Sequence, residues 1–444
     1  MTANSNFRIY LMFLFIILTN FTFSIKPSYI KLEFREKNHF FTIPITVGSK
    51  KQPFEVQVDT TTCETWLPSI NTTFKVDKFD PKTSSTCEIV NKEFEIDDED
   101  GNVRGTPVYD SVTVGPYTLD RFGFVVVQGY QSEFKDFPDG KLGLGFRHEH
   151  GVEFNWLGYL KEKGYIEKEI FTILPKEEKI YVGGIPPELT GDAFSTCDLV
   201  ETNDLDDVFR AGWVCELTHI FFGVDTKEKN LEMALQVDAR VIFDSAYDYI
   251  SFPKRHLNDF NKKFMQEFFN DSCIEVKDDD EIYFICDDDE KIKEGSIAFL
   301  MGGFGYVVPW NKLFKQIEED KYEMLIRFHK ENDDIFSFGY PFTSQFVIVY
   351  NAEDKQLGFY GGEKIDLKKD WDEYMAGESP IQKKEKIKKL LTYGGIFGGI
   401  LLCIIICLVI RSKNMKKSPY EARSMLDAEQ VPQYCLYLIL LIIF

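Results

Sequence analysis

The sequence predicts a mainly β protein of two related lobes, followed by one C-terminal transmembrane helix. Many short runs rich in Val, Ile, Phe, Tyr and Thr, broken by Gly, Pro, Asn and Asp, predict strands and turns over residues 36–366. A pattern around one aspartate recurs in the second half of the chain. A stretch of 19 uncharged residues at 392–410 is long enough to span a bilayer.

Helices are expected in three segments of the body, Val152–Lys163, Leu257–Phe269 and Asn311–Glu319. The remaining body reads as strands, among them HFFTIPITVG, PFEVQVD, FGFVVV, EIYFIC and FVIVYN. A β body of this size is too large for one simple sandwich, because a single hydrophobic core stops growing at this length. Two lobes are therefore expected.

The repeated pattern indicates where the lobes divide. VQVDTTTCETWLP begins at Val56 and VIFDSAYDYISFP begins at Val241. Each has an apolar strand, an aspartate, a small hydroxyl residue and a proline nine positions after the aspartate. Downstream, each half has a short apolar element with glycine, KLGLGF and FSFGYPF. The matched order predicts an N-terminal lobe at 36–190 and a C-terminal lobe at 191–366.

The two aspartates of this pattern, Asp59 and Asp244, suggest a chemistry. If the lobes pack face to face, the carboxylates meet, and two close carboxylates share one proton because both cannot ionise cheaply. One can then act as base toward a water while the other, protonated, polarises a carbonyl. This chemistry needs neither cofactor nor metal, and none is expected. The plain alternative is a strand end with turn-forming residues.

Further runs stand in a fixed order, namely FFTIPITVGSKKQPFEVQVDTTTCETWLPS, FDPKTSSTC, DGKLGLGF, IYVGGI, WVCEL, VIFDSAYDYISFP and GYPFTSQFVIVYNAEDKQLGFY. In these runs the chain resembles the pepsin-like aspartic proteases over roughly residues 36–362. The resemblance implies a bilobal fold whose cleft between the lobes binds a peptide or protein substrate and cleaves it. It also implies catalytic roles for Asp59 and Asp244.

The resemblance assigns supporting roles to three hydroxyl residues. Thr60 and Ser245 match residues that lock the two aspartate loops together, and Thr62 matches one that bonds the outer oxygen of the first carboxylate. Two positions after each aspartate the family has glycine, where this chain has Thr61 and Ala246. If that backbone is strained for a residue with a Cβ, alanine costs about 1 kcal/mol and threonine more.

Other departures concern Tyr247, which stands where the family has Ser or Thr, and Asp98, which stands where the flap usually has tyrosine. Lys141 and Ser337 replace apolar residues beside the glycines of the two downstream elements. Two hypotheses remain open, a membrane-tethered aspartic endopeptidase and a catalytically impaired pseudo-protease that binds peptide or protein in the same cleft. A third is a glycosylated cell-surface structural protein without a functional cleft.

The ends of the chain predict a type I membrane protein of the secretory pathway. Residues 1–24 have the pattern of a signal peptide, with an uncleaved anchor as the alternative. A charged linker at 367–391 leads to the span at 392–410, and residues 411–444 form a cytosolic tail. The ectodomain is then lumenal or extracellular, and an acidic compartment would suit the proposed chemistry.

Cysteine content and charge fit that compartment. The even number of ectodomain cysteines predicts disulfides between neighbours in sequence, with a catalytic thiol as the alternative for any of them: Cys63 with Cys87, Cys197 with Cys215, and Cys273 with Cys286. Asn71 and Asn270 lie in glycosylation sequons. The net charge of −21 argues against a nucleic-acid partner, because phosphate binding needs a basic surface.

Overall fold

The computed structural model describes residues 28–366 except 32, 36–39, 74, 92–93, 99–100, 131–137, 147–150, 190–193, 201–211, 226–229, 270–271, 279–280, 288–291, 293–294 and 330–334. The predicted signal peptide, linker, span and tail lie outside these residues. Among the described helices, none is long and apolar enough to cross a membrane. Both predicted lobes belong to one compact unit.

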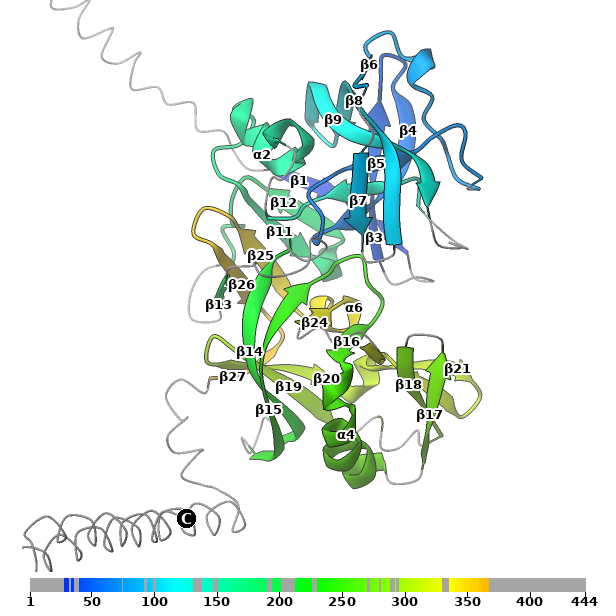
Figure 1. Cartoon of the computed structure of the whole chain (residues 1–444). Helices are drawn as coiled ribbons and strands as arrows, with labels where there is room; N and C mark the ends of the chain where they lie inside the picture. Colours follow the sequence, from blue (N-terminus) through cyan, green and yellow to red (C-terminus); the bar gives the residue numbers. More distant parts are fainter. Residues whose placement is uncertain are drawn as a thin grey trace, which may run out of the picture. The chain divides into compact units, whose positions relative to one another are not determined.

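The first half of the chain builds a nine-stranded sheet with the strand order β2-β3-β4-β10-β5-β9-β8-β6, and β7 pairs with β8 (Figure 1). Strand β3, with the sequence FFTIPITV, is buried along most of its length and leaves only its proline exposed, which fits a strand inside the core. The strands are β2 (Glu33–Arg35), β3 (Phe40–Val47), β4 (Gln52–Asp59), β5 (Trp66–Pro68), β6 (Glu88–Ile89), β7 (Phe94–Asp98), β8 (Gly101–Val114), β9 (Tyr117–Tyr130) and β10 (Lys141–Gly143).

The second half builds a twelve-stranded sheet with the order β21-β22-β18-β23-β16-β24-β15-β14-β19-β20-β27, and β17 pairs with β18. Its strands are β14 (Val214–Asp225), β15 (Asn230–Phe243), β16 (Ile250–Pro253), β17 (Cys273–Asp278), β18 (Glu281–Cys286), β19 (Ser296–Met301), β20 (Phe304–Pro309), β21 (Phe314–Glu318), β22 (Lys321–Met324), β23 (Ile326–His329), β24 (Ile335–Phe338) and β27 (Glu363–Asp366). The chain is thus mainly β, as expected.

A third sheet of six strands takes members from both halves, in the order β1-β12-β11-β25-β26-β13. Its strands are β1 (Ser28–Lys31), β11 (Ile170–Leu174), β12 (Lys179–Val182), β13 (Ser195–Asp198), β25 (Val347–Asn351) and β26 (Gln356–Tyr360). Phe171 on β11 stacks on Tyr350 of β25 with 4.4 Å between ring centroids, and Trp213 packs edge-on against both. The shared sheet joins the halves, and the boundary predicted at residue 190 stays a prediction.

Two of the three predicted helices form. The 3-10 turn η2 (Val152–Phe154) leads into α2 (Trp156–Glu162), whose N-cap Asn155 accepts a hydrogen bond from the backbone of Gly158. The turn η4 (Lys254–His256), α4 (Leu257–Phe260) and the π-helix η5 (Asn261–Phe269) follow one another and bury several phenylalanines. Short elements η1 (Pro81–Thr83), η3 (Pro175–Glu177), η6 (Trp310–Lys312) and α6 (Tyr340–Thr343) complete the described helices.

The helix predicted at Asn311–Glu319 is wrong. The turn η6 ends at Lys312, and the rest of the segment is strand β21, which pairs with β22. Asp320 in the connecting turn has a φ of 62°, which lets the chain reverse tightly. In this strand only Phe314 is buried. A mostly exposed edge strand carries no two-residue alternation, and its pattern cannot be told from that of a helix.

Two of the three predicted disulfides form, Cys197–Cys215 and Cys273–Cys286. The Cys63–Cys87 disulfide is wrong, because Cys63 lies buried in the loop after Asp59 whereas Cys87 lies beside β6 and is influenced by Asp110 of β8. Burial first, and then the charges of Asp110 and Glu88, raises the pKa of the Cys87 thiol to about 11. A thiol with this pKa is a poor nucleophile, which disfavours a catalytic role for Cys87.

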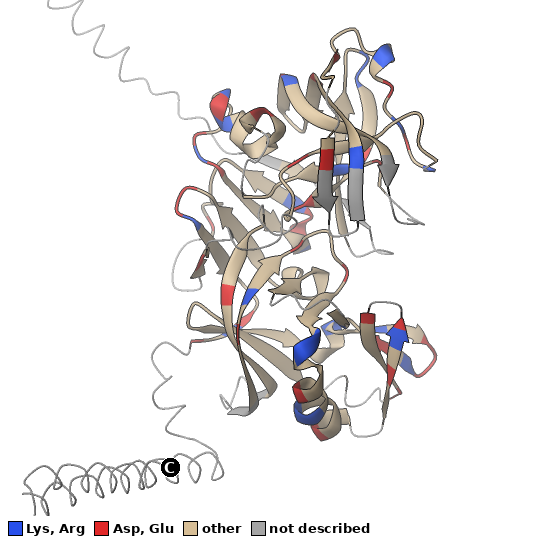
Figure 2. Ribbon diagram, in the orientation of Figure 1, with Lys and Arg blue, Asp and Glu red and all other residues tan. Residues whose placement is uncertain are grey.

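Charged residues are distributed over the described surface of both halves. Figure 2 shows lysine and arginine segments interspersed with aspartate and glutamate segments along the described ribbon, on strands, helices and loops. This mixture matches the acidic composition of the chain, 72 acidic against 51 basic residues. The predicted lack of a nucleic-acid partner stays a prediction.

Candidate active site

The same local arrangement carries an aspartate in each half of the fold. In the first half, β4 ends at Asp59 and runs parallel to β10, with Gly143 opposite Asp59. In the second half, β15 ends at Phe243, just before Asp244, and runs parallel to β24. Each neighbouring strand in turn pairs antiparallel with the next one, β10 with β5 and β24 with β16. The sequence repeat therefore corresponds to a structural repeat.

A glycine after the neighbouring strand allows each aspartate loop to pack closely. A Cβ on Gly143 would lie 2.4 Å from the backbone carbon of Cys63, and one on Gly339 would lie 2.3 Å from the carbonyl oxygen of Tyr247. Atoms do not approach so closely, and both positions require glycine. This contact sets the path of both aspartate loops.

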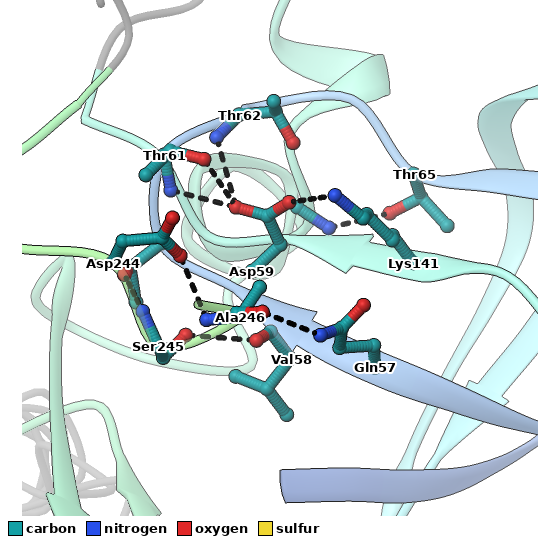
Figure 3. Close-up of polar contacts among 12 residues, drawn as sticks. Gln57, Val58, Asp59, Thr61, Thr62, Thr65, Lys141, Asp244, Ser245 and Ala246 are labelled. Carbon is teal, nitrogen blue, oxygen red and sulfur yellow. Dashed lines mark hydrogen bonds and ion pairs between the residues drawn. The ribbon is translucent and has the colours of Figure 1, made fainter. Parts of the chain in front are cut away.

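The two loops bond directly to each other across the halves (Figure 3). Thr60 Oγ1 donates to the carbonyl of Phe243 at 2.7 Å and accepts from the backbone N–H of Ser245 at 3.0 Å. Ser245 Oγ donates to the carbonyl of Val58 at 2.8 Å. These bonds join the residues beside Asp59 to the residues beside Asp244, and they place the two carboxyl residues next to each other.

Asp59 is fully buried and both of its oxygens are engaged. Oδ1 accepts hydrogen bonds from the backbone N–H of Thr61 at 2.8 Å, the hydroxyl of Thr61 at 2.6 Å and the backbone N–H of Thr62 at 3.3 Å. Oδ2 lies 3.0 Å from Nζ of Lys141, whose side chain is 2% exposed. Burial alone would raise the pKa of Asp59, but the charge of Lys141 and the Thr61 hydrogen bonds outweigh it, and that pKa lies below its ordinary 3.8.

Asp244 is held by a matching backbone contact. Its Oδ1 accepts from the backbone N–H of Ala246 at 2.7 Å, just as Asp59 accepts from Thr61. Gln57 adds a further bond across the halves, from Nε2 to the carbonyl of Ala246 at 3.0 Å. Each carboxylate thus receives the N–H of the residue two positions after it.

The strain expected at Thr61 and Ala246 is absent. The non-glycine residues with positive φ in the described chain are Lys51, Glu178, Asp238, Asp320 and Lys355, and neither loop residue is among them. A Cβ costs little where φ is negative, because the left-handed clash does not arise. The expected cost of these two substitutions is therefore wrong, and the Thr61 hydroxyl adds a hydrogen bond to Asp59.

These features recur in a known family of proteins. A family model described as eukaryotic aspartyl protease matches residues 40–360. The chain belongs to this family. An acid protease of Saccharomycopsis fibuligera is 21% identical over 340 residues, which covers 72% of this chain and 80% of that protein. Pregnancy-associated glycoprotein 4 of Ovis aries is 24% identical, over 62% of this chain and 68% of that protein.

A third relative, gastricsin of Cavia porcellus, is 27% identical over 34% of this chain and 42% of its own length, so the chain matches less than half of that protein. Membership of the aspartyl protease family confirms the resemblance seen in the sequence and supports a peptidase-type function at the level of the family. It implies that a peptide substrate binds in the cleft.

The role expected for Thr62 in this aspartyl protease is wrong. Its hydroxyl has no hydrogen-bond partner within the described part of the chain, and Lys141 holds Oδ2 of Asp59 in its place. Tyr247, the corresponding residue after Asp244, has its hydroxyl 3.3 Å from Oε1 of Glu281 and 3.3 Å from Nε2 of His329. The two carboxylates therefore have different surroundings.

The residues around Tyr247 form a charged cluster in the second half of this aspartyl protease. Arg327 is buried between the rings of Tyr249 and Tyr283, 4.2 and 3.7 Å from their centroids. It forms ion pairs with Glu323 and with Glu281, the latter at 3.8 Å. The cluster connects the Asp244 loop to β18, β22 and β23 and stabilises that side of the site.

Other predicted site residues lie away from the pair or outside the description. Asp98 is the last residue of β7, paired with Gly101 of β8, and its side chain is outside the described residues. Asn71 is exposed in the turn after β5, whereas Asn270 lies outside the described residues. Flap and glycosylation roles stay predictions. In the described chain no group of three or more His, Cys, Asp and Glu could hold a metal ion.

The contact between Lys141 and Asp59 was not predicted. The sequence marks Lys141 only as a replacement of an apolar residue, although a lysine inside DGKLGLG is itself a signal. Gly143 packs on the aspartate loop, and Lys141 stands two positions before it, on the same, buried side of the strand. A charged side chain at such a position needs a counter-charge. In this aspartyl protease Asp59 provides it.

Proposed function

We propose that this protein is a membrane-tethered aspartic endopeptidase in which Asp59 and Asp244 together activate a water molecule. The observation that carries the proposal is the cross-bonded pair of loops, in which each carboxylate accepts the N–H of the residue two positions on. Rigid backbone donors hold both groups ready before substrate binds, and such preorganisation lowers the barrier for reaction.

The proposed reaction is general acid–base hydrolysis. One ionised aspartate takes a proton from water, the water oxygen attacks the peptide carbonyl carbon, and the other aspartic acid gives its proton to the carbonyl oxygen. The aspartate that took the water's proton then gives it to the amide nitrogen, while the aspartate that protonated the carbonyl oxygen takes a hydroxyl proton from the gem-diol. The C–N bond then breaks to release a carboxylic acid and an amine, and the pair again holds one proton.

The tether and the compartment are part of the proposal and rest on the sequence. Residues 1–24 and 392–410 would place the folded unit on the lumenal or extracellular side of a membrane. Protease added to sealed microsomes is expected to spare residues 25–391 and to remove only the tail at 411–444. Digestion of the folded unit in intact vesicles would contradict this orientation.

The second candidate function is peptide binding without cleavage. The ion pair of Asp59 with Lys141 favours this second function, because a cation beside one carboxylate changes how readily the two carboxylates share a proton. The position of Tyr247 also favours it, because its hydroxyl is shared with Glu281 and His329.

Cleavage of a peptide library by the full chain in detergent, between about pH 3 and pH 7, separates the two functions. We expect cleavage by the parent and a loss of at least about 10³-fold in Asp244→Asn, since acid–base groups contribute 10²–10⁴-fold and the pair acts as a unit. Folded parent that binds a statine-type peptide inhibitor and cuts nothing would favour the binding function. Equal cleavage by parent and variant would contradict both the role of Asp244 and the proposed mechanism.

A further inference from the structure

Lys141 is a buried charge for which the proposed mechanism has no role. Its side chain is 2% exposed, and the side chain of its partner Asp59 is fully buried. A buried ammonium is stable only with a counter-charge, because removal from water costs several kcal/mol per ion. The family's peptide chemistry needs no lysine at this place, and its presence calls for a separate explanation.

The equivalent position in the other half is not charged. Lys141 on β10 lies opposite Gln57, two residues before Asp59, and Ser337 on β24 lies opposite Ile242, two residues before Asp244. Ser337 is buried, and its hydroxyl has no hydrogen-bond partner in the described chain. One structural position thus gives Asp59 a cation and gives Asp244 a neutral neighbour.

Lys141 approaches Asp59 without separating it from Asp244. Nζ contacts Oδ2, whereas Oδ1 receives the Thr61 and Thr62 donors. Figure 3 shows Lys141 on the side of Asp59 away from Asp244. The lysine can therefore set the charge of Asp59 without lying between the two aspartates.

Three other titratable groups in the described part of the chain lie in the elements packed around the pair, and they are acidic or phenolic. Asp244 belongs to the facing loop, and Glu64 is buried in the loop that packs on Gly143. Tyr350 on β25 lies close to Thr60 and Asp244, and burial raises the pKa of this phenol, which stays neutral. Among these groups Lys141 supplies the positive charge.

We propose that Lys141 divides the roles of the pair, keeping Asp59 ionised as the base toward water and leaving Asp244 as the residue that carries the proton. Lys141 is a positioning residue here, because it acts through Asp59. The inference rests on the proposed function, since the two roles have meaning only in an acid–base site.

Removal of the lysine should move the pH dependence upward. The positive charge favours ionised carboxylates, so the parent pair keeps Asp59 ionised to lower pH. Without it, burial favours the protonated forms, and the pair holds its protons to higher pH. Both the acid and the alkaline limb of the profile of kcat/KM against pH should therefore shift to higher pH. The acid limb should shift by about 1–3 pH units, as expected for an opposite charge within hydrogen-bonding distance.

The experiment compares four forms of the full chain in detergent: parent, Lys141→Leu, Lys141→Gln and Lys161→Met. Leucine suits a buried strand position, and glutamine keeps a polar side chain of similar length without charge. Lys161 is the matched control, because it forms ion pairs with Glu169 at 3.2 Å and Glu353 at 2.7 Å on the surface. We expect the pH profiles of both Lys141 variants to shift to higher pH, and the profile of Lys161→Met to match that of the parent.

A second measurement does not depend on cleavage. The affinity of a statine-type peptide inhibitor is measured against pH for the same variants, since its hydroxyl binds to the protonated form of the pair. In the Lys141 variants the pH dependence of inhibitor affinity should shift to higher pH. If this shift occurs although the parent cuts no peptide, the proposed function fails and the role of Lys141 stands. The inference would be overturned if the pH profiles of the Lys141 variants stay within about 0.3 pH unit of the parent in both assays, against the expected shift of about 1–3 pH units. Cleavage by the parent would then still support the proposed function.

A third comparison covers the case in which neither Lys141 variant folds. Asp244→Asn keeps a neutral donor where the proton is placed and preserves the charged Asp59–Lys141 pair, whereas Asp59→Asn removes the charged base. Inhibitor binding at neutral pH should therefore be at least about 10-fold tighter in Asp244→Asn than in Asp59→Asn, the scale of one charge-assisted hydrogen bond. The reverse order would overturn the division of roles.

Discussion

Replacement of Asp59 by asparagine is expected to lower the free energy of unfolding by about 3–5 kcal/mol, the cost of breaking a buried ion pair by removing one partner. The variant removes the charge of Asp59 from beside Lys141, whose side chain is 2% exposed, while the asparagine amide can still accept from Thr61. Urea unfolding of the full chain in detergent, followed by tryptophan fluorescence, measures this loss.

Asp244→Asn is the matched control for this prediction. It makes the same chemical change at the equivalent position of the other half, where the neighbouring strand carries Ser337 in place of a lysine. Its loss should stay below about 2 kcal/mol, because the asparagine amide can still accept from Ala246 and the neighbouring Ser337 carries no charge. The double variant Asp59→Asn/Lys141→Leu should recover much of the stability, because an apolar side chain replaces the buried charge that has lost Asp59. Equal losses in the two asparagine variants would contradict the prediction.

The loss in Asp59→Asn should depend on pH in a defined direction. The folded-state pKa of Asp59 lies below its ordinary 3.8, because Lys141 and the Thr61 hydrogen bonds outweigh burial. A lowered carboxyl pKa stabilises the fold fully above the unfolded value and loses that contribution as pH falls through the folded value. The gap between parent and variant should thus be full above pH 3.8 and shrink at more acid pH.

The sequence predicted the features that occur twice in the chain and those that have a strong local pattern. The matched segments after Val56 and Val241 predicted two related aspartate loops, and the structure shows the same parallel strand pairing in both. The hydroxyls of Thr60 and Ser245 bond across the halves. Such features follow from short segments whose strand, turn and glycine signals agree with one another.

What the sequence could not predict depends on contacts between distant residues. Lys141 and Asp59 are 82 positions apart, and only the β4–β10 register brings their side chains together. The expected strain at Thr61 depended on a positive φ that the loop does not adopt. The predicted Cys63–Cys87 disulfide relied on sequence proximity, whereas Cys63 lies in the loop between β4 and β5 and Cys87 directly precedes β6. Burial, register and backbone angles decide these points, and residue types alone do not.

Thr60→Val is expected to lower the free energy of unfolding by about 2–4 kcal/mol, because two buried backbone groups lose their partner and each costs about 1–3 kcal/mol. The shape of the side chain is kept, but the carbonyl of Phe243 and the N–H of Ser245 lose the Thr60 hydroxyl. Ser245→Ala removes one bond, to the carbonyl of Val58, and should cost only about 1 kcal/mol. Urea unfolding of both single variants and of the double variant measures these losses.

The double variant tests whether the two hydroxyls act as one lock. The Thr60 hydroxyl bonds to the loop that carries Ser245, and the Ser245 hydroxyl bonds to the strand that leads to Thr60. Removal of either hydroxyl should therefore already weaken the hydrogen bonds of the remaining one. The double loss should therefore be smaller than the sum of the single losses, by more than about 0.5 kcal/mol. Cleavage should fall in Thr60→Val as well, because a small displacement of one carboxylate from the other costs catalysis steeply. Strict additivity would show that the two hydroxyls act independently. A stable Thr60→Val with unchanged cleavage would show that other contacts, such as the pairing of β11 with β25, set the position of the two aspartates.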